Sequence, residues 1–109
     1  MQPTFYDGDA AILSEADLSQ ILEGKIIVYR YNSTKTVCHR VIEDNIFNLV
    51  TKGDNNRAND KPITRNQIIG EVTAFIPSTI FKIYTTSLIL SYVLFMVVAV
   101  KTVIQRVKK

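Results

Sequence analysis

The sequence predicts a mostly β fold, in which a small β domain is followed by one C-terminal transmembrane helix. Two observations carry this prediction. Residues 1–78 contain short runs rich in β-branched and aromatic residues, separated by polar turns. Beyond them lies a single apolar stretch that is too long for a strand. We therefore divide the 109 residues into a domain over 1–78 and a helix with a basic tail over 79–109.

Five apolar runs in the first part of the chain are the predicted strands. Most have the β-branched and aromatic composition that favours an extended chain, and turn-forming residues separate them. Asp44-Asn45 forms a tight turn that joins the third run to the fourth as a hairpin. The predicted strands are Ala10–Leu13, Lys25–Tyr31, Val37–Glu43, Ile46–Thr51 and Gln67–Ile76.

One segment between the first two runs has helical spacing instead. Ser14 is a capping-type residue with an acidic residue three positions later, and apolar residues follow at intervals of three and four. Gly24 suits the end of a helix. The pattern predicts a short helical turn over Ser14–Gly24.

The apolar stretch from Ile83 to Val100 has eighteen residues and no charge. As a helix it would be about 27 Å long, close to the thickness of the hydrocarbon core of a bilayer. Lys82 and Lys101 flank it and can extend their ammonium groups toward the lipid head groups. We expect a helix from about Ile80 to Arg106 that spans a membrane, with lipid as its partner. A buried core helix is the alternative, but a domain this small offers no core to enclose it.

Charge is distributed unevenly along the chain. The net charge is +3, but residues 1–81 hold eight basic and ten acidic residues, and the basic excess lies at and beyond the apolar stretch. Such a tail is typical of the flank of a membrane span and does not indicate a nucleic-acid surface. It favours a cytoplasmic C-terminus and a domain on the extracellular or lumenal side of a single- or double-pass membrane protein.

The titratable residues with the strongest functional pattern are His39, Asp54 and Asp60. His39 is the only histidine, and strict alternation along its strand places it on one face with Val37 and Val41. The two carboxylates lie in the polar loop after the next strand. A general base and the acid that orients it require this combination of residue types. A packed or solvated histidine is the alternative.

No metal and no other cofactor is expected. Cys38 is the only cysteine, so it cannot form an internal disulfide, and it lies on the opposite strand face from His39. The loop that begins at Asp54 has oxygen ligands of the kind that calcium prefers. However, Asn59 and Arg65 stand where a calcium loop has glycine and glutamate.

Three sequence motifs stand out from this background. They are His39-Arg40-Val41-Ile42, the box T-K-G-D-N-N over residues 51–56 with Asp60 beyond it, and Met1-Gln2-Pro3 followed by T-F-Y-D-G-D. Together they resemble the type I signal peptidase family. The match runs from Met1 to Pro77. It is similar to the branch of archaea, the endoplasmic reticulum and some Gram-positive bacteria, in which histidine replaces the catalytic lysine.

This resemblance implies a fold, an activity and a set of partners. The implied fold is a small, mostly β domain held to a membrane. The implied activity is that of a serine endopeptidase that removes signal peptides from exported proteins. The implied partners are the signal peptides of secretory preproteins, membrane lipid and the subunits of a complex, and no nucleic acid is expected.

The resemblance also implies roles for individual residues. His39 is the expected general base, Asp60 the acid that orients its imidazole, and Asp54 the second candidate for that acid. Met1 and Pro3 belong to the family's Ser-Met-x-Pro motif and are expected at the substrate side of the site.

The serine of that motif is the family's nucleophile, and it would be the residue before Met1. Neither Ser14 nor Ser19 precedes a Met-x-Pro sequence. The chain as given is therefore expected to be inactive. We expect translation to have been assigned to an internal methionine, with a serine and a hydrophobic helix of about 20 residues upstream of it.

Substrate binding and two other functions complete the sequence-based hypotheses. A hydrophobic edge over Ile26–Tyr29, which includes Ile27, is predicted to accept an extended substrate by strand addition. One alternative function is a non-catalytic, membrane-anchored relative that binds exported chains or partner subunits. The other is an unrelated tail-anchored adaptor with its domain in the cytoplasm, against which the H-R-V and K-G-D-N-N boxes argue.

Overall fold

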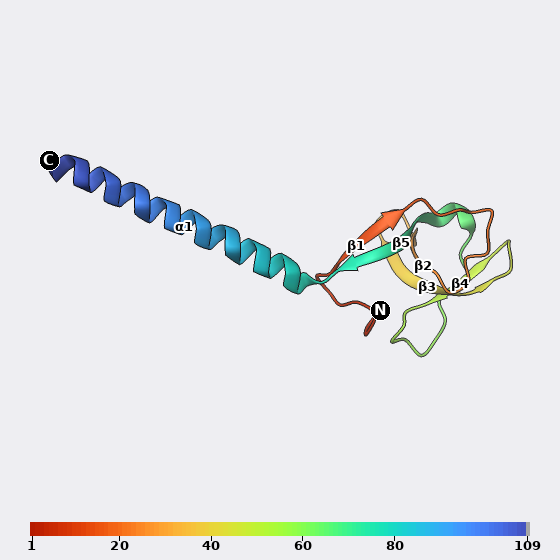
Figure 1. Cartoon of the computed structure of the whole chain (residues 1–109). Coiled ribbons are helices and arrows are strands. Elements are labelled where there is room, and N and C mark those ends of the chain that lie inside the picture. Colours follow the sequence, from red (N-terminus) through yellow and green to blue (C-terminus); the bar gives the residue numbers. More distant parts are fainter. Residues whose placement is uncertain (109) are drawn as a thin grey trace. The chain divides into compact units, whose positions relative to one another are not determined.

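The computed structural model describes residues 1–108 (Figure 1). The chain divides into two compact units, of which the first is Met1–Pro77 and the second contains the long helix. The mostly β fold class is confirmed, as is the single C-terminal apolar helix. The elements are β1 (Ala10–Ser14), β2 (Ile26–Arg30), β3 (Thr36–Asp44), β4 (Leu49–Lys52), a 3₁₀ turn η1 (Arg65–Gln67), β5 (Ile68–Ile76) and α1 (Ser78–Lys108).

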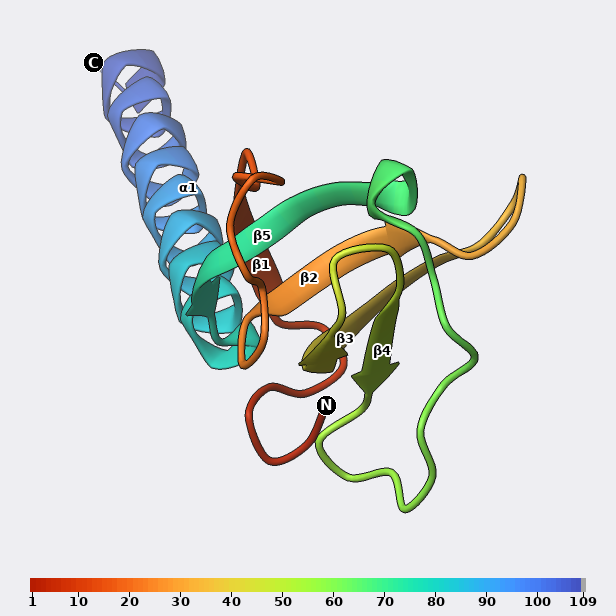
Figure 2. The same cartoon turned by 90° about the vertical axis from the view of Figure 1, so that its right-hand side faces the viewer.

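The five strands form one antiparallel sheet in the order β1-β5-β2-β3-β4 (Figure 2). The sequence-adjacent pairs β2–β3 and β3–β4 are hairpin neighbours, whereas β5 inserts between β1 and β2. Strand β2 is therefore an interior strand. Ile27 pairs on one side with His39 of β3 and on the other side with Glu71 of β5.

The core of the β unit is small and lies on one face of the sheet. Thr51 of β4 is the Cα partner of Val41, and residues opposite each other on antiparallel strands share a face. An isolated bridge between Leu49 and Ile63 brings the loop after β4 back onto this core. The cluster consists of Leu22, Ile27, Tyr29, Val41, Leu49 and Ile63.

The segment Ser14–Gly24 contains no helix, so the predicted helical turn is wrong. Ser14 is the last residue of β1. Beyond it, the Asp17 carboxylate accepts hydrogen bonds from the backbone N–H and the hydroxyl of Ser19, at 3.0 and 2.5 Å. An aspartate that binds the backbone two residues later stabilises a turn and competes with helix formation.

The fourth strand begins at Leu49, three residues later than predicted. The residues before it form the turn of the β3–β4 hairpin, in which the Asn48 N–H donates to the Asn45 side chain at 2.7 Å. Ile46 has a φ of 78°, in the left-handed region that a β-branched residue rarely adopts. The turn therefore includes Ile46 and Asn48 in addition to the predicted Asp44-Asn45.

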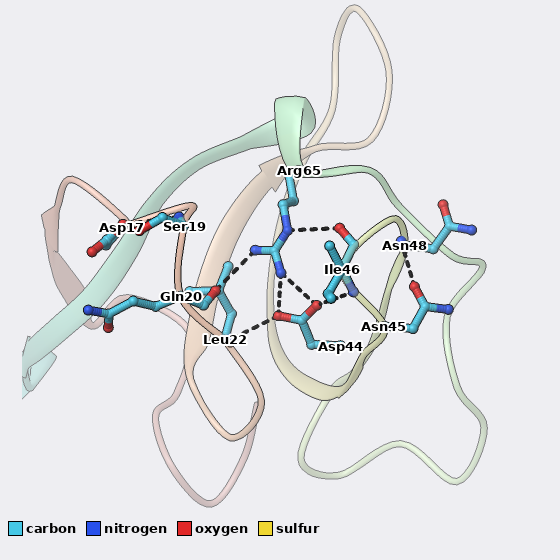
Figure 3. Close-up of polar contacts among 9 residues, drawn as sticks. All are labelled: Asp17, Ser19, Gln20, Leu22, Asp44, Asn45, Ile46, Asn48 and Arg65. Atoms are coloured by element: carbon cyan, nitrogen blue, oxygen red, sulfur yellow. Dashed lines mark hydrogen bonds and ion pairs between the residues drawn. The ribbon is translucent and has the colours of Figure 1, made fainter.

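A buried ion pair holds this strained turn in place (Figure 3). Nη2 of Arg65 lies 2.7 Å from both carboxylate oxygens of Asp44, whose side chain is fully buried. The backbone N–H groups of Leu22 and Ile46 also donate to this carboxylate, at 2.8 and 2.9 Å. Burial tends to raise the pKa of the carboxyl, but the two backbone donors and Arg65 outweigh burial, so the pKa is lowered.

The helix α1 extends two residues beyond its predicted limits at each end, over Ser78–Lys108. In the part of the chain that the structure describes, it is the one helix long and apolar enough to cross a membrane. Three of its threonine hydroxyls are satisfied within the helix. The hydroxyls of Thr85, Thr86 and Thr102 donate to the carbonyls four residues earlier, at 2.8 to 2.9 Å. Hydroxyls bonded in this way are compatible with a lipid environment.

We expect the substitution Asp44→Asn to lower the free energy of unfolding by about 3 kcal/mol, because it leaves the Arg65 guanidinium partly buried without its counter-charge. Urea unfolding of the full chain in detergent micelles, followed by circular dichroism, measures this loss. Asp17→Asn is the matched control, since Asp17 bonds only within its own exposed turn. Equal losses in both variants would contradict a special role for the buried pair.

Candidate active site

His39 lies on β3, on the face of the sheet that packs against the core. Its Cα partner is the fully buried Ile27, and Val37 and Val41 lie on the same face two residues away on either side. The alternation along the strand predicted that these three residues share a face. The imidazole lies at the margin of the core, where 20% of its side-chain surface remains exposed.

Asp60 is the carboxylate that contacts this imidazole. Its Oδ2 atom lies 2.5 Å from Nδ1 of His39. The loop returns to the sheet at this point, because the Asp60 N–H donates to the Thr51 carbonyl at 2.8 Å. Burial tends to raise the pKa of the carboxyl, but the hydrogen bonds that it accepts, first that of His39, outweigh burial and lower the pKa.

The ionised state of Asp60 determines which nitrogen of the His39 imidazole carries the proton. An ionised carboxylate only accepts hydrogen bonds, so Nδ1 of His39 carries the proton and donates it. In the neutral imidazole, Nε2 then has a free lone pair. The arrangement therefore presents Nε2 as an acceptor for a proton from a reacting group.

Gly53 lies beside this second nitrogen. A Cβ atom at Gly53 would lie 3.0 Å from Nε2 of His39 and 2.8 Å from the amide nitrogen of Asn56. Real side chains do not tolerate contacts of this length without a shift of their neighbours. The glycine of the K-G-D box thus leaves space next to Nε2, and the glycine itself is the one sequence feature that could indicate this role.

Asp54 has a different partner and does not contact His39. Its two carboxylate oxygens accept from Nε and Nη2 of Arg40, both at 2.9 Å. Arg40 follows His39 on β3 and therefore lies on the opposite face of the sheet. The guanidinium holds the pKa of the Asp54 carboxyl at about 2, and a hydrogen bond from the Thr4 hydroxyl also lowers it.

The N-terminal segment is bound to the same loop (Figures 1 and 2). The Asp54 N–H donates to the sulfur of Met1 at 3.4 Å, and the Thr4 hydroxyl donates to the Asp54 carboxylate. Met1 and Thr4 are closed into a turn by a backbone hydrogen bond of 2.9 Å, with Pro3 exposed within it. Met1 thus contacts the residue next to Gly53, which itself lies against Nε2 of His39.

The structure contradicts the predicted substrate edge over Ile26–Tyr29. An edge accepts an added strand only where its backbone groups are unpaired. Both sides of β2 are paired, with β3 and with β5, and Ile27 has no exposed surface. The prediction that Ile27 binds substrate is therefore wrong. Period-2 hydrophobicity identifies a strand, but it does not say which strands flank it.

Among residues 1–108, no three His, Cys, Asp or Glu side chains are grouped so that they could hold a metal ion. Cys38 is half-buried, and burial raises the pKa of its thiol, which keeps the sulfur protonated. The polar groups at this site are the His39 imidazole, the Asp60 carboxylate and the hydroxyls that contact this carboxylate.

Comparison with known proteins finds several relatives that share one name. The chain is 34% identical over 106 residues to the signal peptidase complex catalytic subunit SEC11 of Colletotrichum graminicola, with 84% of this chain and 60% of that protein covered. It is 30% identical over 92 residues to the subunit of the same name from Dictyostelium discoideum, covering 72% and 51%. The chain thus spans little more than half the length of these relatives. No family model and no solved structure matches it.

The antiparallel domain, the apolar helix and these relatives define a protein of the signal peptidase class. The chain belongs to the type I signal peptidase family, in the branch that includes the SEC11 catalytic subunits. The family resemblance that the three sequence motifs indicated is confirmed.

We expect the Asp54–Arg40 pair to stabilise the fold at neutral pH and to lose this effect in acid. The folded-state pKa of Asp54, about 2, lies below the ordinary aspartate value of 3.8, so the unfolded chain takes up the proton first as the pH falls. Its contribution of roughly 1 to 2 kcal/mol is complete above about pH 4 and disappears toward pH 2.

Unfolding of the wild type and of Asp54→Asn, measured in parallel from pH 7 to pH 2, tests this. The wild type should be the more stable protein at pH 7, and the difference should shrink below pH 4. A difference that stays constant over the whole range would show that the carboxylate charge is not responsible.

Proposed function

We propose that this chain supplies the general base and the orienting acid of a membrane-bound serine endopeptidase that removes signal peptides from exported proteins. The observation that carries the proposal is the contact of 2.5 Å between His39 and Asp60, which leaves Nε2 beside Gly53. The relatives support it, since they are named as catalytic subunits of a signal peptidase complex.

The proposed chemistry is acyl transfer through a serine. The serine oxygen attacks the scissile carbonyl carbon while Nε2 of His39 takes the hydroxyl proton. The imidazolium then gives that proton to the departing amine as the C–N bond breaks, and water hydrolyses the resulting ester by the same base. Asp60 stabilises the imidazolium and holds the ring in the tautomer that the first step requires.

The N-terminal segment is where the nucleophile fits this scheme. The family motif places the serine directly before Met1, and Met1 contacts the backbone of Asp54. In this proposal Asp54 does not orient the base. It ties the segment that follows the serine to β3 through Arg40, so that the nucleophile and Nε2 approach each other.

The proposed setting is a membrane, with the β unit on the extracellular or lumenal side. The helix α1 is long and apolar enough to span the bilayer, and basic residues occupy its last turn. The proposed partners are the signal peptides of secretory preproteins, membrane lipid and other subunits of a signal peptidase complex. The last of these partners is proposed because the relatives are named as subunits of such a complex.

We expect a chain in which an apolar helix and a serine directly precede Met1 to cleave a signal-peptide substrate. The same chain with alanine before Met1 is the matched control and should lose about 10⁶-fold in kcat, because the nucleophile is gone. His39→Ala should cost a comparable factor, and Asp60→Asn about 10⁴-fold, because the amide favours the wrong imidazole tautomer. Release of the mature product, followed in detergent micelles, measures all four proteins.

The competing function is that of a non-catalytic relative that binds exported chains or partner subunits. If the serine-preceded chain is folded yet cleaves no faster than its alanine control, the protease proposal fails and the binding function is favoured. Cleavage that survives His39→Ala would equally rule out the proposed base.

We expect Gly53→Ala to reduce cleavage by roughly 10²-fold while the protein stays folded. The added methyl would lie 3.0 Å from Nε2 and would displace the imidazole from its position against the nucleophile. Gly24→Ala is a control of a different kind: a Cβ there meets nothing within 4 Å, but its φ of 85° is strained for alanine. It should therefore lower stability and leave the cleavage rate of the folded enzyme unchanged.

A further inference from the structure

Two buried hydroxyl groups lie beneath the Asp60 carboxylate, on the side away from solvent. Thr51 is 0% exposed and Tyr29 is 1% exposed. The Thr51 hydroxyl oxygen lies 2.8 Å from Oδ2 of Asp60, the same atom that contacts His39. The Tyr29 hydroxyl oxygen lies 3.1 Å from that of Thr51 and 3.4 Å from Oδ2.

Both of these hydroxyls lie within hydrogen-bond distance of Asp60 and can donate their protons to it. Each hydroxyl has a single proton to donate, and an ionised carboxylate can only accept. The short contact assigns the Thr51 proton to Asp60. Tyr29 donates its proton to Oδ2 of Asp60 at 3.4 Å, because a buried hydroxyl needs a partner within the protein. Both protons therefore point toward the carboxylate.

The sheet topology explains why these two residues converge. His39 lies on β3, and β2 and β4 are its two neighbours in the sheet. Tyr29 extends from β2 and Thr51 from β4, both from the face that also carries the imidazole. The carboxylate at the end of the polar loop is thus held from three adjacent strands, two of which donate a hydroxyl.

We propose that Thr51 and Tyr29 are positioning residues, which hold Asp60 ionised and directed at His39 through a chain of hydroxyl hydrogen bonds. The catalytic effect of this chain of hydrogen bonds rests on the protease function proposed above. Its effect on the ionisation of Asp60 does not. Outer groups of this kind fix the orientation of the group that they contact and change its proton affinity. A purely structural role would require only that the two hydroxyls be satisfied by each other.

The first experiment uses the chain as it exists, in detergent micelles, and needs no activity. NMR follows the carboxyl carbon of Asp60 and the Nδ1 proton of His39, which is the only histidine and gives an unambiguous signal. Of the titratable side chains, His39 and Tyr29 are those that bond to Asp60. In Thr51→Val, we expect Asp60 to take up its proton about one pH unit higher than in the wild type.

Three variants make this result specific. Thr51→Ser keeps the hydroxyl and should restore the wild-type titration. Tyr29→Phe removes the hydroxyl that lies 3.4 Å from Asp60, a longer contact than that of Thr51. It should therefore shift the titration of Asp60 in the same direction as Thr51→Val, but by less. Tyr31→Phe removes a hydroxyl from a half-exposed neighbour and should change nothing. An Asp60 titration that is unchanged in Thr51→Val and Tyr29→Phe would overturn the proposal, as would a Thr51→Ser variant that behaves like Thr51→Val.

The second experiment measures cleavage in the serine-preceded chain. Thr51→Val should lower kcat by roughly 10-fold to 100-fold with KM unchanged, because a misdirected acid affects the base and not the binding of substrate. An unchanged kcat together with a shifted Asp60 titration would reject the positioning role in catalysis. If the unsubstituted serine-preceded chain does not cleave, the protease proposal fails, while the NMR titration still decides whether the hydroxyls control Asp60.

Discussion

The ionised carboxylate of Asp60 is the constraint on which the rest of the β unit depends. A carboxylate that is three-quarters buried is stable only if donors replace the water that it has lost. Here the donors come from β3, from β4 and, through one further hydroxyl, from β2. The loop that carries Asp60 must therefore end against the sheet, although nothing in its polar sequence would by itself favour burial.

Asp54 and Asp60, six residues apart in one loop, bind side chains on opposite faces of β3. His39 and Arg40 are neighbours on β3 and point to different faces, so a loop that passes the edge of the sheet can bind both. Asp60 binds toward the core and Asp54 toward the N-terminal segment. The loop is short, and fixing one of its ends helps to fix the other. This coupling explains how a unit with so small a core can hold an ordered polar loop.

Local patterns were sufficient for some of this organisation and insufficient for the rest. Composition and alternation identified the strands and placed His39 on the same face as Val37 and Val41, because both depend only on neighbours along the chain. Helical spacing over Ser14–Gly24 misled, since a side chain of the segment bonds its own backbone. The exposure of Ile27 and the contacts of Tyr29 and Thr51 depend on strand order, which joins residues far apart in the sequence. The catalytic assignments stay predictions.

The connection between β5 and α1 has a mechanical consequence. Only Pro77 separates the two elements, and β5 is hydrogen-bonded on both sides, to β1 and to β2. Tension that reaches β5 through Pro77 can therefore extract this strand only by breaking its ladder with β1 and its ladder with β2. A helix attached to an edge strand would be held by one ladder of hydrogen bonds alone. Because α1 follows an inner strand, more hydrogen bonds oppose such tension than if it followed an edge strand.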